Sequence, residues 1–311
     1  MTNIDTSVSI AGLTLKTPVM TASGTCGYGL ELTPYLDLSR LGALVVKGIS
    51  LEPRPGNPPP RIVETSGGML NAIGLENIGM EAFLAETLPR LREHETFVIV
   101  NILGESEEEY GKLVDRMSRQ EGIDGFEVNV SCPNVRKGGI AFGSDPDMLE
   151  KLVGFLRERT EKPLIIKLSP NVSDIVDMAR RAEAGGADGL TLINTIRGMS
   201  IDLESRRPHL ATVVGGLSGP AIKPVALRMV WEAAQKVRIP VIGVGGILDG
   251  EDAVEFLIAG ASAVQVGTAH FRNPAACIEV TEGIGRYLER HGIQDVKELI
   301  GSIRLEPSPV A

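Results

Sequence analysis

The sequence has few aromatic residues, few cysteines, no long apolar run and no surplus of positive charge. Aromatic residues make up only 4% of the 311 residues, and together with 36 glycines this favours an α/β fold with glycine turns over a β-sandwich. Three cysteines without a Cys-x-x-Cys pair argue against a disulfide framework or an iron–sulfur site in this chain. No stretch reaches the roughly 18 uninterrupted apolar residues of a membrane span.

The charge balance is acidic, with 31 basic and 40 acidic residues and a net charge of -9. This balance argues against non-specific nucleic-acid binding and against docking on anionic lipid. The segment Met1 to Asp5 lacks the basic and apolar regions of a signal peptide, so we expect a cytoplasmic protein. We expect no metal site, because the histidines lack partners at ligand spacing, and the missing Gly-x-Gly-x-x-Gly unit argues against a dinucleotide site.

Short runs of Val, Ile and Leu recur along the chain and alternate with amphipathic segments. Near-continuous apolar runs are typical of parallel strands that are covered by helices. Eight such strands predict a single (β/α)8 TIM barrel domain over residues 1–311, with an open doubly wound sheet as the alternative. The predicted strands are 18–23, 43–49, 97–103, 125–131, 163–169, 189–195, 240–246 and 263–269.

Segments outside the barrel strands have their own signals. Residues 8–10 and 13–15 flank Gly12 and predict a small N-terminal hairpin at the amino-terminal end of the barrel. The long connections 50–75, 133–144 and 196–218 follow strands, so they are expected on the C-terminal face, where substrate loops form. Capped helices are predicted from Asp145-Pro146 to about Arg159, from Ser173 to Gly185-Gly186, and from Asp249 with Asp252 to Gly260.

Polar side chains interrupt five of the predicted strands close to their carboxyl ends. They are Lys47, Asn101, Asn129, Lys167 and Asn194. The carboxyl ends of barrel strands surround one mouth, so these side chains are expected at one level. Burying them unpaired would cost about 1–3 kcal/mol each, and more for the two ammonium groups. One polar ligand with some negative charge, lying across the mouth, would satisfy all five.

The last two predicted strands end in glycine, in Gly243-Val244-Gly245-Gly246 and Gly267-Thr268. Backbone amides after strands seven and eight of a barrel, beside a helix N-terminus, form its usual phosphate site. Glycine lets the backbone approach phosphate oxygens closely, although the same residues could serve only tight turns. A phosphate attached to an extended polar ring system is what FMN presents, so we predict FMN as the ligand.

Cys132 lies where a predicted strand passes into a glycine-rich loop, in Val128-Asn129-Val130-Ser131-Cys132-Pro133-Asn134. A thiol at this place is either a small core residue or a positioned acid/base. The local residues alone leave both readings open. Cys26 and Cys277 are expected to pack in the core.

Three segments together resemble the dihydroorotate dehydrogenases: Asn71-Ala72-Ile73-Gly74-Leu75, Asn129-Val130-Ser131-Cys132-Pro133-Asn134 and Ile193-Asn194-Thr195. The similarity runs from Thr21-Ala22-Ser23-Gly24 to Gly267-Thr268, and the segment Ser131 to Gly139 resembles the NAD-linked class 1B catalytic subunit. The quinone-linked class has Ser in place of the Cys and an N-terminal extension, and this chain has neither. The resemblance implies oxidation of (S)-dihydroorotate to orotate on FMN in pyrimidine biosynthesis.

The resemblance also implies roles for single residues, with Cys132 as the general base. A free thiol titrates near about pH 8.5, so activity is expected to rise towards alkaline pH. Substrate would be held by Lys47, Asn71, Ala72, Ile73, Gly74, Leu75, Asn129, Asn194 and Thr195. FMN would be bound by Ser23, Lys47, Gly48, Asn101, Asn129, Lys167, Ile193, Gly219, Gly245, Gly246, Gly267 and Thr268.

The partners implied by the resemblance are a second copy of this chain and a smaller electron-transfer subunit, in a heterotetramer. The smaller subunit would carry FAD and a 2Fe–2S cluster and would pass electrons to NAD+. Three rivals remain: a fumarate-linked class 1A homodimer, a non-redox lyase or isomerase with Lys167 as a Schiff-base amine, and a non-catalytic flavin-binding chain. Arg136 stands where the family often has Lys, and no role is assigned to it.

Overall fold

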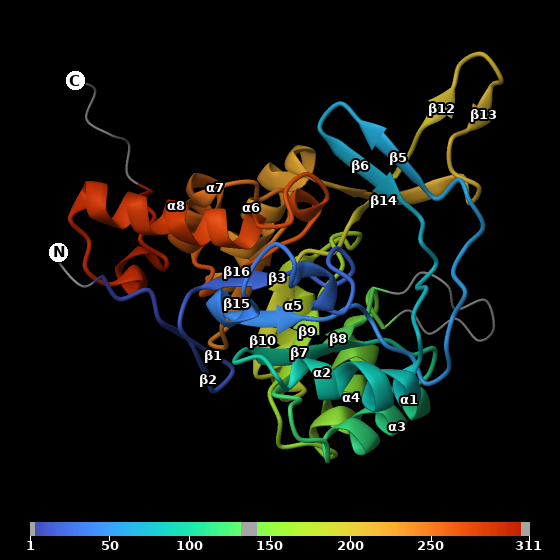
Figure 1. The fold of residues 1–311 in the computed structure, drawn as a ribbon, viewed down its shortest axis with the longest axis horizontal. Coiled ribbons are helices and arrows are strands. Elements are labelled where there is room, and N and C mark those ends of the chain that lie inside the picture. The colour runs from blue at the N-terminus through green and yellow to red at the C-terminus, as the bar shows by residue number, and fades with distance from the viewer. Residues whose placement is uncertain (1–3, 132–141, 306–311) are drawn as a thin grey trace.

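A computed structural model describes residues 4–131 and 142–305. Eight parallel strands close into a barrel in the spatial order β10-β15-β16-β3-β4-β7-β8-β9, which confirms the predicted (β/α)8 fold (Figure 1). Every predicted strand is present, and each is shorter than its apolar run. The barrel strands are β3 (Val19–Thr21), β4 (Ala43–Val45), β7 (Phe97–Ile102), β8 (Gly125–Asn129), β9 (Leu164–Lys167), β10 (Gly189–Leu192), β15 (Val241–Val244) and β16 (Ala263–Val266).

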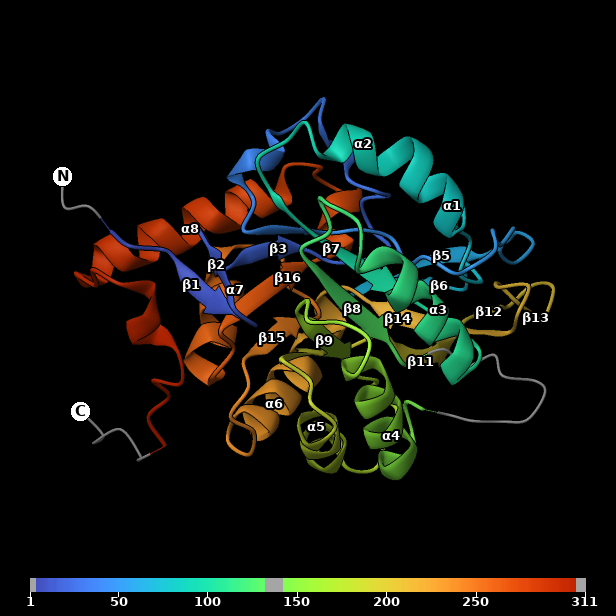
Figure 2. The same cartoon turned by 90° about the horizontal axis from the view of Figure 1, so that it is seen from below.

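Helices surround the barrel because each has one apolar face that packs on the strands. The view in Figure 2 shows α4, α5 and α6 side by side along the outside of β8, β9 and β15. The α-helices are α1 (Met80–Ala82), α2 (Leu88–Leu91), α3 (Glu107–Met117), α4 (Pro146–Arg157), α5 (Ile175–Ala184), α6 (Lys223–Ala234), α7 (Gly250–Ala259) and α8 (Ala276–His291). Shorter turns are η1 (Leu30–Leu32), η2 (Leu38–Arg40), the π-helical η3 (Phe83–Thr87), η4 (Pro220–Ile222), η5 (Thr268–Phe271) and η6 (Val296–Leu299).

Two of the three predicted helix starts are confirmed, and one is wrong by one residue. Asp145 accepts a hydrogen bond from the Met148 amide at 3.0 Å, and Asp249 forms a capping box with Asp252 at the start of α7. At the start of α5 the cap is Asp174 rather than Ser173. The Asp174 carboxylate accepts hydrogen bonds from two amides of the first turn. Both residues carry a suitable oxygen, and the extended backbone at position 174 selects the aspartate.

The predicted N-terminal hairpin is confirmed as β1 (Val8–Ile10) paired with β2 (Leu13–Leu15). Its apolar side chains belong to the core cluster, and Ile10 and Leu15 are fully buried. Figures 1 and 2 place the hairpin on the far side of the barrel from β5 (Ile62–Thr65) and β6 (Gly68–Asn71). It therefore leaves the opposite mouth of the barrel to the long connections.

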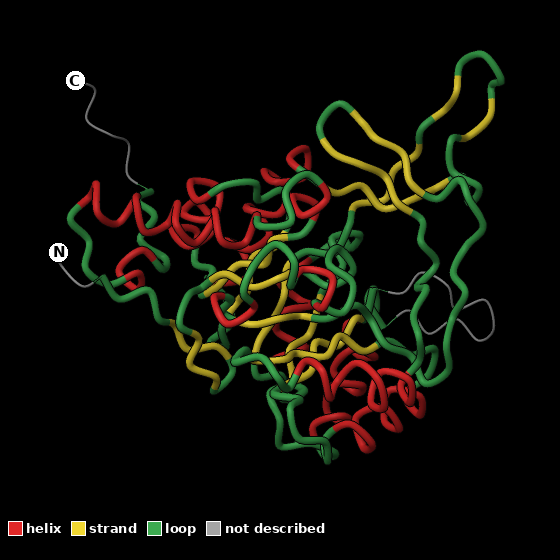
Figure 3. Tube along the Cα trace, in the orientation of Figure 1, coloured by secondary structure: helices red, strands yellow, loops and turns green. Residues whose placement is uncertain are grey.

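Two of the long connections contain strands that the sequence analysis left as loops. Four of these strands form a sheet in the order β11 (Ile196–Met199), β14 (Val214–Ser218), β6, β5, and this sheet stands apart from the barrel in Figure 3. A two-stranded ribbon of β12 and β13 extends beyond it. These strands are β5 (Ile62–Thr65), β6 (Gly68–Asn71), β11 (Ile196–Met199), β12 (Ile201–Asp202), β13 (Arg207–Pro208) and β14 (Val214–Ser218).

No helix within residues 4–131 and 142–305 is both long and apolar enough to cross a membrane. Cys26 and Cys277 are buried, as expected for packing residues. Burial raises the pKa of the Cys26 thiol to about 12 and that of the Cys277 thiol well above its ordinary value, so neither is suited to act as a base near neutral pH.

Candidate active site

The polar strand ends meet at the carboxyl-end mouth of the barrel. Asn129 on β8 lies directly opposite Lys167 on β9, and Asn101 on β7 lies opposite Glu127 on β8. Lys47 and Asn194 follow β4 and β10 by two residues each. Asn101 and Lys167 are buried, whereas the other three strand-end residues are half-buried.

Glu127 is a functional candidate that the sequence analysis missed. Its carboxylate is fully buried inside the barrel and accepts a hydrogen bond from Asn101 Nδ2 at 2.7 Å. Lys167 Nζ lies 3.4 Å from the same oxygen, Oε1. Some of the polar strand-end groups for which the sequence predicts a ligand therefore have partners within the protein. Asn101 Oδ1 remains buried without a partner among the described residues.

Asn129 and Asn194 form a second pair at the mouth, with Asn194 Nδ2 donating to Asn129 Oδ1 at 3.2 Å. The same oxygen accepts the backbone amide of Ser131 at 3.1 Å, and the Tyr110 hydroxyl donates to the Asn129 carbonyl at 2.7 Å. These contacts fix the strand exit that leads to position 132. Cys132 itself and residues 133–141 lie outside the described part of the chain.

The segment Asn71 to Leu75 leaves β6 and is held by the preceding connection. Asn57 binds it twice, donating from its backbone amide to the Ile73 carbonyl at 2.9 Å and from Nδ2 to the Ala72 carbonyl at 2.9 Å. Gly74 has a φ of 77° and passes so close to Asn57 that a β-carbon would lie 2.5 Å from its backbone nitrogen. Only glycine fits there without displacing the backbone. Asn57 is another residue that the sequence analysis missed.

Strand β14 joins this segment to the barrel mouth. Asn71 Nδ2 donates to the Gly216 carbonyl at 3.3 Å. Gly216 lies against Thr195, because a β-carbon at Gly216 would come within 2.1 Å of Thr195 Oγ1. The Asn194 Oδ1 atom accepts the Thr195 amide at 2.8 Å. The structure therefore brings together predicted substrate residues from three distant segments.

The other end of β14 leads into a cradle of glycines. A β-carbon on Gly219 would lie 2.7 Å from the Gly68 Cα atom and 3.6 Å from Thr268 Cγ2, and one on Gly246 would lie 3.0 Å from the Gly219 carbonyl oxygen. Thr268 Oγ1 donates to Ser218 Oγ at 2.8 Å. The predicted phosphate residues after β15 and β16 thus converge with Gly219, which precedes η4.

The remaining predicted cofactor residues border the same region. Gly48 is buried against Asn101, whose Oδ1 atom lies 2.9 Å from the position of a β-carbon on Gly48. Among the residues that the structure describes, none accepts a hydrogen bond from the Lys47 ammonium. The other predicted positions follow barrel strands and are buried or half-buried: Ser23, Ile193, Gly245 and Gly267.

The donor set fits FMN on two independent features. Glycine lets the backbone at Gly219 and Gly246 pack closer to its neighbours than a side chain would allow, beside the start of η4 and α6, so that several amides can surround one small anion. Two buried polar atoms on barrel strands, Asn101 Oδ1 and Gln265 Oε1, have no hydrogen-bond partner within residues 4–131 and 142–305. No group of three or more metal-ligating side chains occurs in the described ranges.

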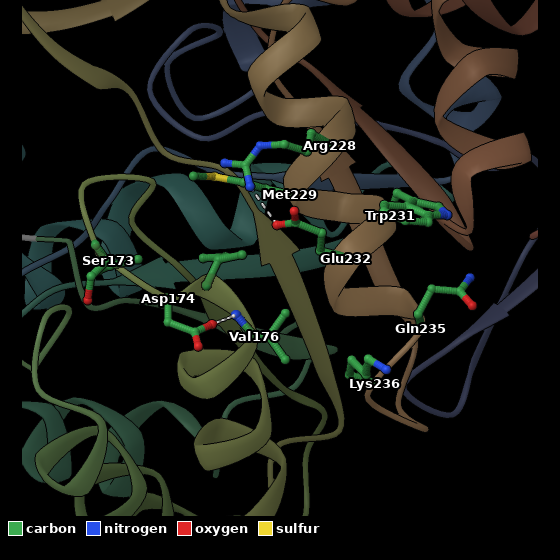
Figure 4. Close-up of a pocket in the computed structure, with 11 residues that line it drawn as sticks. Ser173, Asp174, Val176, Arg228, Met229, Trp231, Glu232, Gln235 and Lys236 are labelled. Atoms are coloured by element: carbon green, nitrogen blue, oxygen red, sulfur yellow. Dashed lines mark hydrogen bonds and ion pairs between the residues drawn. The ribbon is translucent and has the colours of Figure 1, made fainter.

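A cavity of about 600 Å³ lies elsewhere, between the start of α5 and α6 (Figure 4). Its lining includes Asp174, Trp231 and the ion pair of Arg228 with Glu232, whose Nη1 and Oε2 atoms are 2.6 Å apart. None of the predicted site residues lines it. It belongs to the outer layer of helices, and we assign no catalytic role to it.

Comparison with known proteins agrees with this geometry. A family model described as dihydroorotate dehydrogenase matches residues 6–288. The chain belongs to the dihydroorotate dehydrogenase family. Its solved neighbours include a dihydroorotate dehydrogenase from Eimeria tenella, crystallised with ferulenol, at a TM-score of 0.77 and 27% identity. That match covers 96% of this chain and 88% of the other.

Curated members of the family are much more similar in sequence. The proteins named dihydroorotate dehydrogenase B (NAD(+)), catalytic subunit, from Geotalea daltonii and Geotalea uraniireducens are each 58% identical to this chain. The first match covers 98% of this chain and 100% of the relative, and the second covers 96% and 98%. The resemblance to the class 1B catalytic subunits is therefore confirmed along nearly the whole chain.

Proposed function

We propose that this chain is the catalytic subunit of an NAD-linked dihydroorotate dehydrogenase, which oxidises (S)-dihydroorotate to orotate in pyrimidine biosynthesis. One observation carries the proposal: β14 connects the glycine cradle at one end with the Asn71, Thr195 and Asn194 cluster at the other. An anion site and a cluster of amide groups on one mouth match a ligand pair of a flavin phosphate and a cyclic amide.

The chain's own residues would hold FMN through two kinds of contact. Backbone amides near Gly219, Gly246 and Thr268 would bind the phosphate, because the cradle allows a close approach. Asn101 and Lys167 would face the polar edge of the ring system, with Oδ1 of Asn101 as an acceptor and the ammonium as a donor. When bound, FMN supplies the hydride acceptor for the oxidation.

Substrate chemistry then falls to the residues at the mouth. The amide groups of Asn71, Asn129 and Asn194 would bind the ring amides of dihydroorotate, and the Lys47 ammonium would offset the charge of its carboxylate. Cys132 follows Ser131, whose amide is fixed by Asn129. We propose that its thiolate takes the proton from the carbon next to the substrate carbonyl.

The environment of Lys167 argues against the lyase or isomerase alternative. A Schiff-base lysine must present a neutral amine to a carbonyl substrate. Lys167 is instead buried beside the carboxylate of Glu127, at 3.4 Å. That ion pair suits a lysine that binds a ligand through its hydrogen-bond donors, and not one that attacks a carbonyl.

We propose a cytoplasmic heterotetramer as the working assembly, with two copies of this chain and an electron-transfer subunit that carries FAD and a 2Fe–2S cluster. The curated relatives are named as catalytic subunits, which supports a separate redox partner. Large apolar side chains are exposed on or beside β5, β11, β12 and the turn before β14, and this surface supports self-association. They are Ile62, Met199, Ile201, Leu203 and Val213.

The purified chain, with and without a co-expressed electron-transfer subunit, tests the proposal. We expect a yellow protein that releases FMN on heating, reduces an artificial acceptor with dihydroorotate, and reduces NAD+ only when the partner is present. Reduction of fumarate by the isolated chain would favour the class 1A alternative. A colourless protein that binds no added FMN would contradict the proposal, and an FMN-bound chain without turnover would support the non-catalytic alternative.

A further inference from the structure

The function proposed above assigns no contact with substrate or FMN to Glu127, yet its carboxylate is enclosed by four donors. Oε1 accepts from Asn101 Nδ2 at 2.7 Å and lies 3.4 Å from Lys167 Nζ. Oε2 accepts from Thr191 Oγ1 at 2.9 Å and from Gln265 Nε2 at 2.6 Å. Oε1 thus contacts the two side chains that we assign to FMN binding, and Oε2 contacts two other buried side chains of the barrel strands.

The strands that carry these residues explain the division. Glu127, Thr191 and Gln265 come from β8, β10 and β16, which are alternate strands of the barrel. Side chains of alternate strands fill one layer of a barrel interior. Asn101 and Lys167 come from β7 and β9, the two strands that flank β8. The Glu127 carboxylate therefore connects an interior layer with the side chains of both neighbouring strands.

Stability alone does not account for a carboxylate at this place. Removing a carboxylate and an ammonium from water is costly, and well-packed apolar residues in place of a buried ion pair are often as stable or more so. Most other fully buried side chains of the described chain are apolar. A polar centre in this layer is better explained by the orientation that it imposes on its neighbours.

That orientation is specific. A carboxylate accepts hydrogen bonds and cannot donate them, so Asn101 must turn Nδ2 towards Glu127. The amide oxygen of Asn101 is then the atom left over, and it is buried beside Gly48 with no partner in the described part of the chain. Lys167 is drawn to the same carboxylate oxygen, and its ammonium makes no other hydrogen bond to the described residues, which leaves donors for a ligand. Glu127 thus determines that Asn101 presents an acceptor and Lys167 presents donors.

We infer that Glu127 is a positioning residue, which orients Asn101 and Lys167 towards FMN and compensates the charge of Lys167. The inference rests on the proposed FMN site. It requires that the effect of Glu127 on the cofactor be transmitted through these neighbours, so replacing Glu127 and Lys167 together should cost less than the sum of the two single replacements.

A double-mutant cycle on the full-length chain tests this inference. Glu127→Gln, Lys167→Met and the double variant are freed of flavin, and FMN is titrated back by fluorescence. We expect Glu127→Gln to weaken FMN binding at least about tenfold, as when one member of a buried hydrogen-bonded charge pair is removed. In the Lys167→Met background the same change should weaken binding less than about threefold.

The midpoint potential of the bound flavin gives a second readout that a purely structural residue would not move. Glu127→Gln should raise this potential, because it removes a negative charge near a ring that gains electrons on reduction. Thr191→Val is the matched control. It removes a donor from Oε2 only, so it should lower the melting temperature while leaving FMN affinity and potential as in the wild type. Glu127→Asp, which keeps the charge but withdraws the carboxylate, replaces Glu127→Gln in the FMN titrations alone if Glu127→Gln does not fold.

The outcomes separate this inference from the proposed function. If the wild type binds FMN and Glu127→Gln binds it equally well or more tightly, the inference is wrong. Equal losses in both Lys167 backgrounds, or an unchanged midpoint potential, would also overturn it. If the wild type binds no FMN at all, the proposed function fails first, and Glu127 has no cofactor to position.

Discussion

Gly246→Ala is the substitution that most sharply tests the proposed phosphate cradle. Gly246 has a φ of 82°, a conformation that costs an L-residue about 1–2 kcal/mol. A β-carbon there would lie 2.9 Å from the Lys223 backbone nitrogen and 3.0 Å from the Gly219 carbonyl oxygen. Both contacts are with backbone, so the segment cannot relieve them by rotating a side chain. The start of α6 must move away from the end of β15.

Gly292→Ala provides the matched control for backbone strain. Gly292 ends α8 with a φ of 67°, and apart from its chain neighbours no atom of the described residues lies within 4 Å of the position of a β-carbon there. This substitution carries the conformational cost without the collision, so it should destabilise the fold by about 1–2 kcal/mol and leave flavin binding unchanged. The difference in FMN affinity between the two variants therefore reports the effect of the backbone displacement at Gly246 alone.

The expected effect of Gly246→Ala on the cofactor is a selective loss of phosphate binding. A hydrogen bond to a charged group contributes about 2 kcal/mol, so losing one backbone contact to the phosphate should weaken FMN binding about 30-fold. Riboflavin lacks the phosphate, and its affinity should change less than about threefold by the same reasoning. Fluorescence titration of both flavins measures the two constants. Equal losses for FMN and riboflavin, or no loss for either, would refute the assignment of Gly246 to the phosphate site.

Three further predictions concern separate parts of the molecule. Cys132→Ala should abolish steady-state turnover of dihydroorotate while FMN stays bound, and turnover at the wild-type rate would contradict the assignment of the base. Burial lowers the pKa of His270 to about 4. As the pH falls below about 6.5, the imidazole therefore takes up a proton in the unfolded chain but not yet in the folded one. The free energy of unfolding should fall by up to about 3 kcal/mol from pH 6.5 to pH 4. Urea unfolding of His270→Gln should show a weaker pH dependence, and an unchanged slope would contradict the pKa shift. Asp174→Ala should destabilise the protein by about 1 kcal/mol in the same assay, whereas Ser173→Ala should have little effect, and the reverse order would contradict the observed helix cap.

The barrel could be predicted because its strands are buried on both faces and therefore read as continuous apolar runs. The additional sheet could not, since β6 and β14 pair across a separation in sequence that no local pattern spans. Their segments also contain Gly67, Gly68, Gly215 and Gly216, which indicate turns when read locally.

The positions at the barrel mouth could be predicted wherever a polar residue marked a strand end, as with Asn101, Asn129 and Lys167. Glu127 and Gln265 carry the same signal one or two residues earlier in their strands, inside apolar runs. They were missed because only the strand ends were read as functional. Asn57 does not lie at a strand end, so the sequence gives no indication of its role. Its contact with Ile73 depends on how the long connection between them folds back on itself.

Anaerobic reduction of the bound flavin by dihydroorotate tests the central claim most directly. The FMN-loaded chain is mixed with dihydroorotate in the absence of oxygen, and the visible absorbance of the oxidised flavin is followed. The account predicts rapid bleaching with formation of orotate in the wild type, and little bleaching in an FMN-bound Cys132→Ala variant. A wild-type flavin that stays oxidised with dihydroorotate, yet is bleached by dithionite, would contradict it.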